Sequence, residues 1–95
     1  MFHIEGRRWF DSVNGNTYHS VRIFKDGSLL VFLPFQYGYG SQYIETALEW
    51  LEDNGHIGYR ERNPKTNARA GGTRFLREEL GASYSVVDVS RKKDL

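Results

Sequence analysis

The stretch from Leu29 to Leu51 runs Leu-Leu-Val-Phe-Leu-Pro-Phe-Gln-Tyr-Gly-Tyr-Gly-Ser-Gln-Tyr-Ile-Glu-Thr-Ala-Leu-Glu-Trp-Leu. Its first part, residues 29–35, is almost wholly apolar, which is typical of a strand covered on both faces or placed at the centre of a sheet. Apolar residues then recur at helical spacing, at Ile44, Ala47, Leu48 and Leu51. This pattern predicts an amphipathic helix over about 41–54, which we expect to cover the preceding strand.

The remaining segments predict further strands at 2–10, 17–25 and 83–89 and a short helix at 73–80. Asp26-Gly27 is the dipeptide that a two-residue hairpin prefers, so the second and third strands are expected to pair. The fold class is therefore predicted as α+β, an antiparallel sheet in the order β-β-β-α-α-β with helices packed on one face. The last strand is free to pair beside the first strand or at the other edge.

Composition limits the class of protein. The chain has 95 residues, no cysteine and a formal net charge of +1, so we expect one domain over 1–95 without disulfides. Within it, 57–72 is predicted to be a long basic loop and 90–95 a basic tail. No apolar run is long enough for a signal peptide or a bilayer span, and we expect a cytoplasmic protein without a membrane partner.

The glycine and tyrosine residues between the third strand and the helix form the first candidate site. Glycines at 38 and 40 permit a tight turn, and aromatic side chains with polar tips follow at Tyr37, Tyr39 and Tyr43. These three tyrosines are predicted to bind a partner. The alternative is a turn whose tyrosines pack on the sheet. A dinucleotide-binding loop is disfavoured because Tyr43 stands where its third glycine is needed.

The second candidate site is basic and would bind nucleic acid or phosphate through Arg60, Arg62, Lys65, Arg69, Thr73 and Arg74. The glycines before Thr73 add a possible anion nest at the start of a helix. The alternative is a charged loop that is simply solvated.

Two further groups of residues have both a functional and a structural interpretation. Arg7-Arg8-Trp9-Phe10 interleaves cations with aromatic rings, a pattern that can stack a base or grip a peptide. Strand alternation explains it equally simply, and we expect Trp9 to be buried and the arginines exposed. The three histidines have no metal-ligand spacing, and His19 is expected to form hydrogen bonds within the sheet.

No pattern of a nucleophile with a base, of paired hydrolase carboxylates or of a metal-binding carboxylate cluster is present. We therefore expect no catalytic residues, no metal and no cofactor, and a protein that is not an enzyme.

The segments 7–10, 15–21, 35–40 and 87–95 together resemble a group of small uncharacterised bacteriophage proteins, and the resemblance covers nearly the whole chain. It implies a compact protein made in the cytoplasm of an infected bacterium. It carries over no catalytic residues.

Three functions follow as hypotheses. The first is a non-catalytic binding protein that engages a host or defence protein through the tyrosine loop and the adjacent helix. The second is nucleic-acid binding through the basic region 60–77. The third is a sponge for a small phosphorylated ligand, held near Thr73 and Arg74 between subunits. A homodimer is possible, because a small strand-rich domain has sheet edges to protect.

Overall fold

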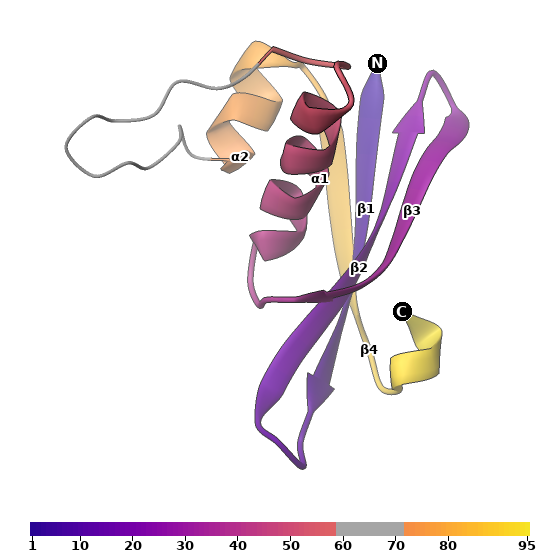
Figure 1. The fold of residues 1–95 in the computed structure, drawn as a ribbon, viewed down its shortest axis with the longest axis vertical. Helices are drawn as coiled ribbons and strands as arrows, with labels where there is room; N and C mark the ends of the chain where they lie inside the picture. The colour runs from indigo at the N-terminus through magenta and orange to yellow at the C-terminus, as the bar shows by residue number, and fades with distance from the viewer. Residues whose placement is uncertain (59–71) are drawn as a thin grey trace, which may run out of the picture.

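The computed structural model describes residues 1–58 and 72–95. Its elements are β1 (Phe2–Asp11), β2 (Asn16–Lys25), β3 (Ser28–Tyr37), α1 (Gln42–Asp53), α2 (Gly72–Arg74), the π-helical segment η1 (Phe75–Glu79), β4 (Ser83–Val89) and the 3₁₀ turn η2 (Lys92–Asp94). The predicted α+β class is confirmed. α1 and the α2–η1 segment lie on one side of the sheet, and η2 lies on the other (Figure 1).

The four strands form one sheet in the order β3-β2-β1-β4. β1 and β2 pair antiparallel, as do β2 and β3, whereas β4 runs parallel to β1 with Ile4 opposite Tyr84. The sheet is therefore mixed, and the expectation of a wholly antiparallel sheet is corrected. The chain crosses the helical side of the sheet before it reaches β4. This crossover allows β4 to run in the same direction as β1.

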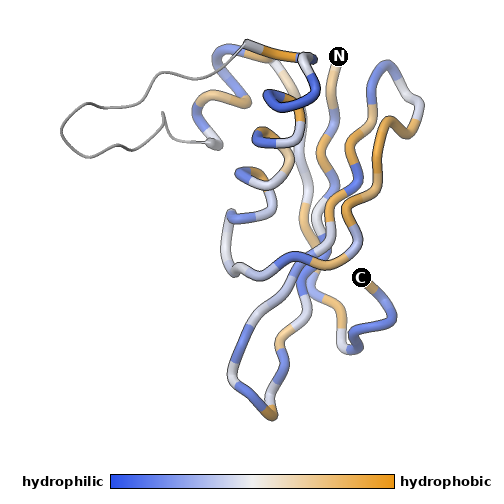
Figure 2. Tube along the Cα trace, viewed as in Figure 1, coloured by the Kyte–Doolittle hydropathy of each residue, from blue (hydrophilic) through white to orange (hydrophobic). Residues whose placement is uncertain are grey.

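The position of β3 also differs from the expectation. The apolar run of 29–35 predicts a central or doubly covered strand, but β3 is an edge strand. Figure 2 shows this hydrophobic run along the edge of the sheet. Its side chains are divided between the two faces, so that Leu33 packs against the core, whereas Phe32 and Phe35 stay more than 40% exposed on the other face.

The core lies between α1 and the sheet. Ile44, Ala47, Leu48 and Leu51 are almost completely buried, as the helical spacing predicts, and they pack with side chains of β1, β2 and η1. The partners from these elements are Ile4, Val21, Ile23 and Leu76. One stripe of the helix thus closes the apolar face of the sheet, the usual source of stability in a two-layer domain.

The Asp26-Gly27 hairpin is confirmed. Both residues have positive φ, 51° and 84°, and the ladder between β2 and β3 continues to the pair Lys25 and Ser28. A two-residue turn with positive φ at both positions matches the right-handed twist of the strands that it joins. This turn fixes the residue at which β3 starts. The register of the β2–β3 ladder then shifts before the strand reaches the loop between β3 and α1.

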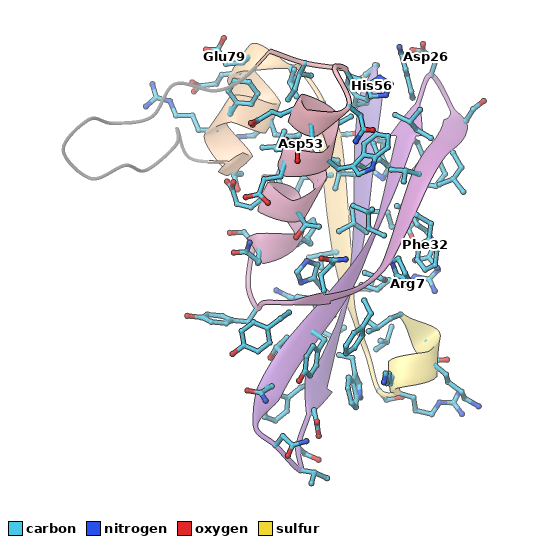
Figure 3. All side chains as sticks on the ribbon, viewed as in Figure 1. Arg7, Asp26, Phe32, Asp53, His56 and Glu79 are labelled. Atoms are coloured by element: carbon cyan, nitrogen blue, oxygen red, sulfur yellow. The ribbon has the colours of Figure 1, made fainter. Side chains whose placement is uncertain are left out.

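Side chains alternate between the two faces of the sheet. On β1, Gly6 and Arg8 face α1, because Gly6 packs under Tyr43 and Arg8 reaches Gly40. Arg7 therefore points the opposite way, together with Phe32 of β3 (Figure 3). We call this second side, which η2 partly covers, the far face.

Candidate functional site

Two exposed aromatic side chains stand at the end of β3 and in the loop that joins it to α1. Tyr37 is 69% exposed and Tyr39 is 78% exposed, whereas Gly38 between them is buried. Gly38 has φ 144°, and a side chain there would collide with Gln42. Only glycine fits this position without strain. The backbone is thus held inside while the rings on either side point outward.

His19 fixes this loop from beneath. It is fully buried on β2, with Nδ1 3.1 Å from the Gly38 carbonyl oxygen and Nε2 2.8 Å from Thr46 Oγ1. Because a carbonyl oxygen only accepts, Nδ1 carries the proton, and in the neutral ring Nε2 accepts from the Thr46 hydroxyl. One imidazole therefore joins β2, the loop and α1. The prediction that His19 forms hydrogen bonds is correct, but its partners belong to the loop and the helix.

Burial lowers the pKa of His19 below its ordinary value of 6.5, and the hydrogen bond to Gly38 opposes that effect. The unfolded chain then binds more protons at this ring than the folded protein does. We expect the stability that His19 contributes to be complete above pH 6.5 and to decline as the pH falls through the lowered pKa of the folded state. Urea unfolding of the wild type and of His19→Gln between about pH 5 and 8 measures this. A stability difference that stays constant with pH contradicts it.

Arg8 holds the other side of the loop. Its Nε and Nη2 donate to the two carboxylate oxygens of Asp88 at 2.8 and 3.3 Å, and its Nη1 donates to the Gly40 carbonyl oxygen at 3.2 Å. This bidentate pair links β1 to β4, and the third bond links both strands to the loop. Arg91, three residues after Asp88, donates from Nε to Asp94 Oδ2 at 3.0 Å.

Two shallow hollows flank Tyr39. The first, of about 300 Å³, is lined by residues from β1, β2, the loop and β4: Arg8, Phe10, Thr17, Tyr39, Gly40, Asp88 and Val89. The second, of about 620 Å³, is lined by the loop and the start of α1: Tyr37, Gly38, Tyr39, Gly40, Ser41, Gln42 and Glu45. Phe10 is 59% exposed, so three aromatic side chains stand on this surface. We call Phe10, Tyr37 and Tyr39 the loop surface.

Tyr43 does not belong to this surface, which corrects its assignment as a partner-binding residue. Its side chain is 3% exposed and packs on Gly6, where a methyl group would lie only 2.5 Å from Tyr43 Cδ2. Burial raises the pKa of its hydroxyl. Tyr43 is four residues before Ala47, so helical spacing places it on the buried stripe of α1.

Most of the predicted basic site cannot be placed. Arg60, Arg62, Lys65 and Arg69 lie outside the described residues. Thr73 is half-buried, and the exposed Arg74 donates from Nε to Glu78 Oε2 at 2.8 Å. The Glu45 carboxylate lies so close to Gly72 that a side chain on that glycine would collide with it. A negative group therefore already stands beside this helix start, which disfavours an anion nest there.

Sequence analysis missed Phe10, Thr17 and Asp88 as members of the site. Phe10 belongs to the Arg7-Arg8-Trp9-Phe10 motif described above, but its exposure depends on how far β1 extends beyond α1. Asp88 is 80 residues from Arg8, and only the pairing of β1 with β4 brings them together. No local spacing signals a contact of this kind.

In the described ranges 1–58 and 72–95, no three His, Asp or Glu side chains are grouped to hold a metal ion. Within the same ranges, no helix has the length and apolar character needed to cross a membrane. Comparison of this chain with protein-family models, curated proteins and solved structures finds no match.

Proposed function

We propose that this chain is a non-catalytic binding protein that engages another protein through the loop surface. The observation that carries the proposal is the exposure of Tyr37 and Tyr39 on a backbone that is itself pinned by buried contacts. Tyrosine covers a large contact area and loses little rotamer entropy on binding, which is why it is common at interface hot spots.

The anchoring of the loop supports this proposal. His19 and Arg8 bond to the carbonyl oxygens of Gly38 and Gly40, the two glycines that flank Tyr39. A loop that is already ordered loses less conformational entropy when a partner binds. The two hollows beside Tyr39 are suited to receive side chains of that partner, and Arg8 with Asp88 offers both signs of charge in the first hollow.

The resemblance to small bacteriophage proteins suggests which proteins to test. We propose a host or defence protein of the infected bacterium as the partner. Such a role needs no catalytic group, and the exposed residues of the loop surface are aromatic rather than nucleophilic.

Replacement of Tyr39 by alanine is expected to weaken partner binding by about 2 kcal/mol, or about 30-fold, with little change in melting temperature. The partner is first recovered from phage-infected bacteria by affinity capture with wild-type protein, and its affinity is then measured by calorimetry. Val13→Ala is the matched control, because Val13 is 89% exposed but lies in the turn between β1 and β2. Equal recovery of the same proteins by wild type and by Tyr39→Ala would contradict the proposal.

A further inference from the structure

The far face carries a row of aromatic rings that crosses three strands. Trp9 of β1 stacks on Tyr18 of β2 with ring centroids 5.9 Å apart, and Tyr18 stacks on Phe35 of β3 at 4.6 Å. Tyr37 meets Tyr18 edge-on at 5.7 Å. We call these four side chains the aromatic row. Trp9 was expected to be buried, but it is only half-buried, and Phe35 is 43% exposed.

Cationic side chains accompany this row. Arg7 Nη1 donates to the Asp94 carbonyl oxygen at 3.1 Å, and Arg22 Nη2 donates to the main-chain oxygen of Leu95 at 3.5 Å. Lys92 Nζ lies 4.8 Å from the centroid of the Phe35 ring. Two guanidinium groups and an ammonium group are thus gathered around the stacked rings.

The charge of this cluster is only partly neutralised. Burial and the positive charge of Arg7 both lower the pKa of Arg22, while Glu5 acts in the opposite direction. Arg22 Nη1 is buried and has no hydrogen-bond partner among the described residues. Glu5 approaches Arg7 at 3.4 Å, but the acceptor that the tail supplies to Arg7 is the Asp94 carbonyl oxygen, and Arg22 has only a long bond of 3.5 Å to Leu95. The far face therefore favours a negatively charged ligand.

We propose that the far face binds single-stranded nucleic acid, with bases stacking on the exposed part of the aromatic row and phosphates bound by Arg7, Arg22 and Lys92. Stacking suits a single strand because its bases present open ring faces, which a duplex keeps inside its own stack. A phosphate offers Arg7 a charged acceptor in place of the Asp94 carbonyl oxygen, and charge-assisted hydrogen bonds are the stronger kind.

Charge also favours this occupant over a second copy of the chain. Two copies that pair through the same face would bring together Arg7, Arg22 and Lys92 of both, and burying like charges opposes association. A single strand of nucleic acid can stack its bases on the rings and place its phosphates beside the cations. This surface shares Tyr37 with the loop surface, but Tyr39 and Phe10 lie apart from it, at the first hollow on the helical side of the sheet.

The test is fluorescence anisotropy with labelled single strands of ~12 nucleotides, as DNA and as RNA, and with the matching duplex. We expect a single strand to bind more tightly than the duplex and affinity to fall steeply between about 50 and 200 mM salt. Phe35→Leu, which keeps apolar volume but removes the ring, is expected to weaken binding about tenfold. Phe35→Trp should retain it. Arg7→Gln and Arg22→Gln should each reduce the salt slope by about one.

Tyr39→Ala is the control, since it removes an even more exposed aromatic ring outside the row and is expected to leave oligonucleotide affinity unchanged. Circular dichroism confirms that each variant is folded. Binding that resists Phe35→Leu, or no binding at tens of micromolar protein at the lowest salt, overturns the proposal. A dimer that sediments as such, that Phe35→Leu abolishes and that binds no oligonucleotide would assign the far face to a second copy instead.

Discussion

Replacement of Gly6 by valine is expected to lower the free energy of unfolding by about 3 kcal/mol, because Tyr43 already fills the space above this glycine. A Cβ at Gly6 would lie 2.5 Å from Tyr43 Cδ2 and 2.7 Å from Cγ. Tyr43 is 3% exposed and is held between α1 and the sheet, so its ring cannot move aside without opening the core. Urea unfolding followed by circular dichroism measures the loss.

Two variants make this prediction specific. Gly58→Ala is the control, since a methyl group there meets no described atom within 4 Å, and we expect its stability to stay near that of the wild type. In the double variant Gly6→Val with Tyr43→Ala, the clash is removed, so its cost should be smaller than the sum of the two single costs. Additive costs would show that Gly6 and Tyr43 do not compete for this space.

Replacement of His19 by alanine is expected to cost about 3 kcal/mol of stability, because it leaves a cavity and removes two buried hydrogen bonds. The Gly38 carbonyl loses its bond from Nδ1, and the Thr46 hydroxyl loses its acceptor. The loop then loses its attachment to β2. We therefore expect His19→Ala to weaken partner binding as well, although His19 is fully buried.

Thr46→Val provides the comparison for His19. It keeps the volume of the side chain and breaks only the bond to Nε2, so we expect a loss of about 1 kcal/mol with the loop still bonded to Nδ1. Thermal unfolding measures the stabilities, and calorimetry measures partner binding. If His19→Ala proved no less stable than Thr46→Val, the role of the imidazole as the anchor of the loop would be wrong.

Local pattern predicted the elements of this fold well. The apolar spacing from Ile44 to Leu51 predicts a helix over about 41–54, and α1 spans Gln42–Asp53. Ser41 directly precedes the helix, but its side chain makes no capping hydrogen bond, and the Ser41 carbonyl accepts from the Ile44 N–H at 3.0 Å. Periodicity and turn chemistry act within a few residues, and such signals are readable from one sequence.

The order of the strands was not readable in the same way. The apolar run 29–35 is typical of a central strand, yet β3 is an edge strand. The run is apolar throughout because its side chains are divided between both faces of the sheet. An apolar sequence indicates that both faces of a strand are hydrophobic, but it does not indicate which elements cover each face. The direction of β4 depends on the path of the chain across the helical side of the sheet, for which the sequence contains no local code.

The candidate sites show the same difference between features that depend on a few neighbouring residues and features that depend on strand pairing. Tyr37, Tyr39 and Tyr43 were predicted to bind a partner; Tyr37 and Tyr39 are exposed, whereas Tyr43 is buried. The aromatic row was not predicted as a unit, although its members were all visible in the sequence. Rings from three strands meet only through the pairing of β1 with β2 and of β2 with β3. Single residues are thus easier to predict than groups assembled across strands.

The parallel pairing of β1 with β4 also determines when the sheet can be completed during synthesis. β1, β2 and β3 are joined by short turns and can associate soon after they leave the ribosome. The free edge of β1 must wait for residues 83–89, which are translated long after β1. Arg8 likewise receives its Asp88 partner only at that stage. The nascent chain therefore presents an unpaired strand edge until β4 has been translated, and this edge is where premature association with other chains would start.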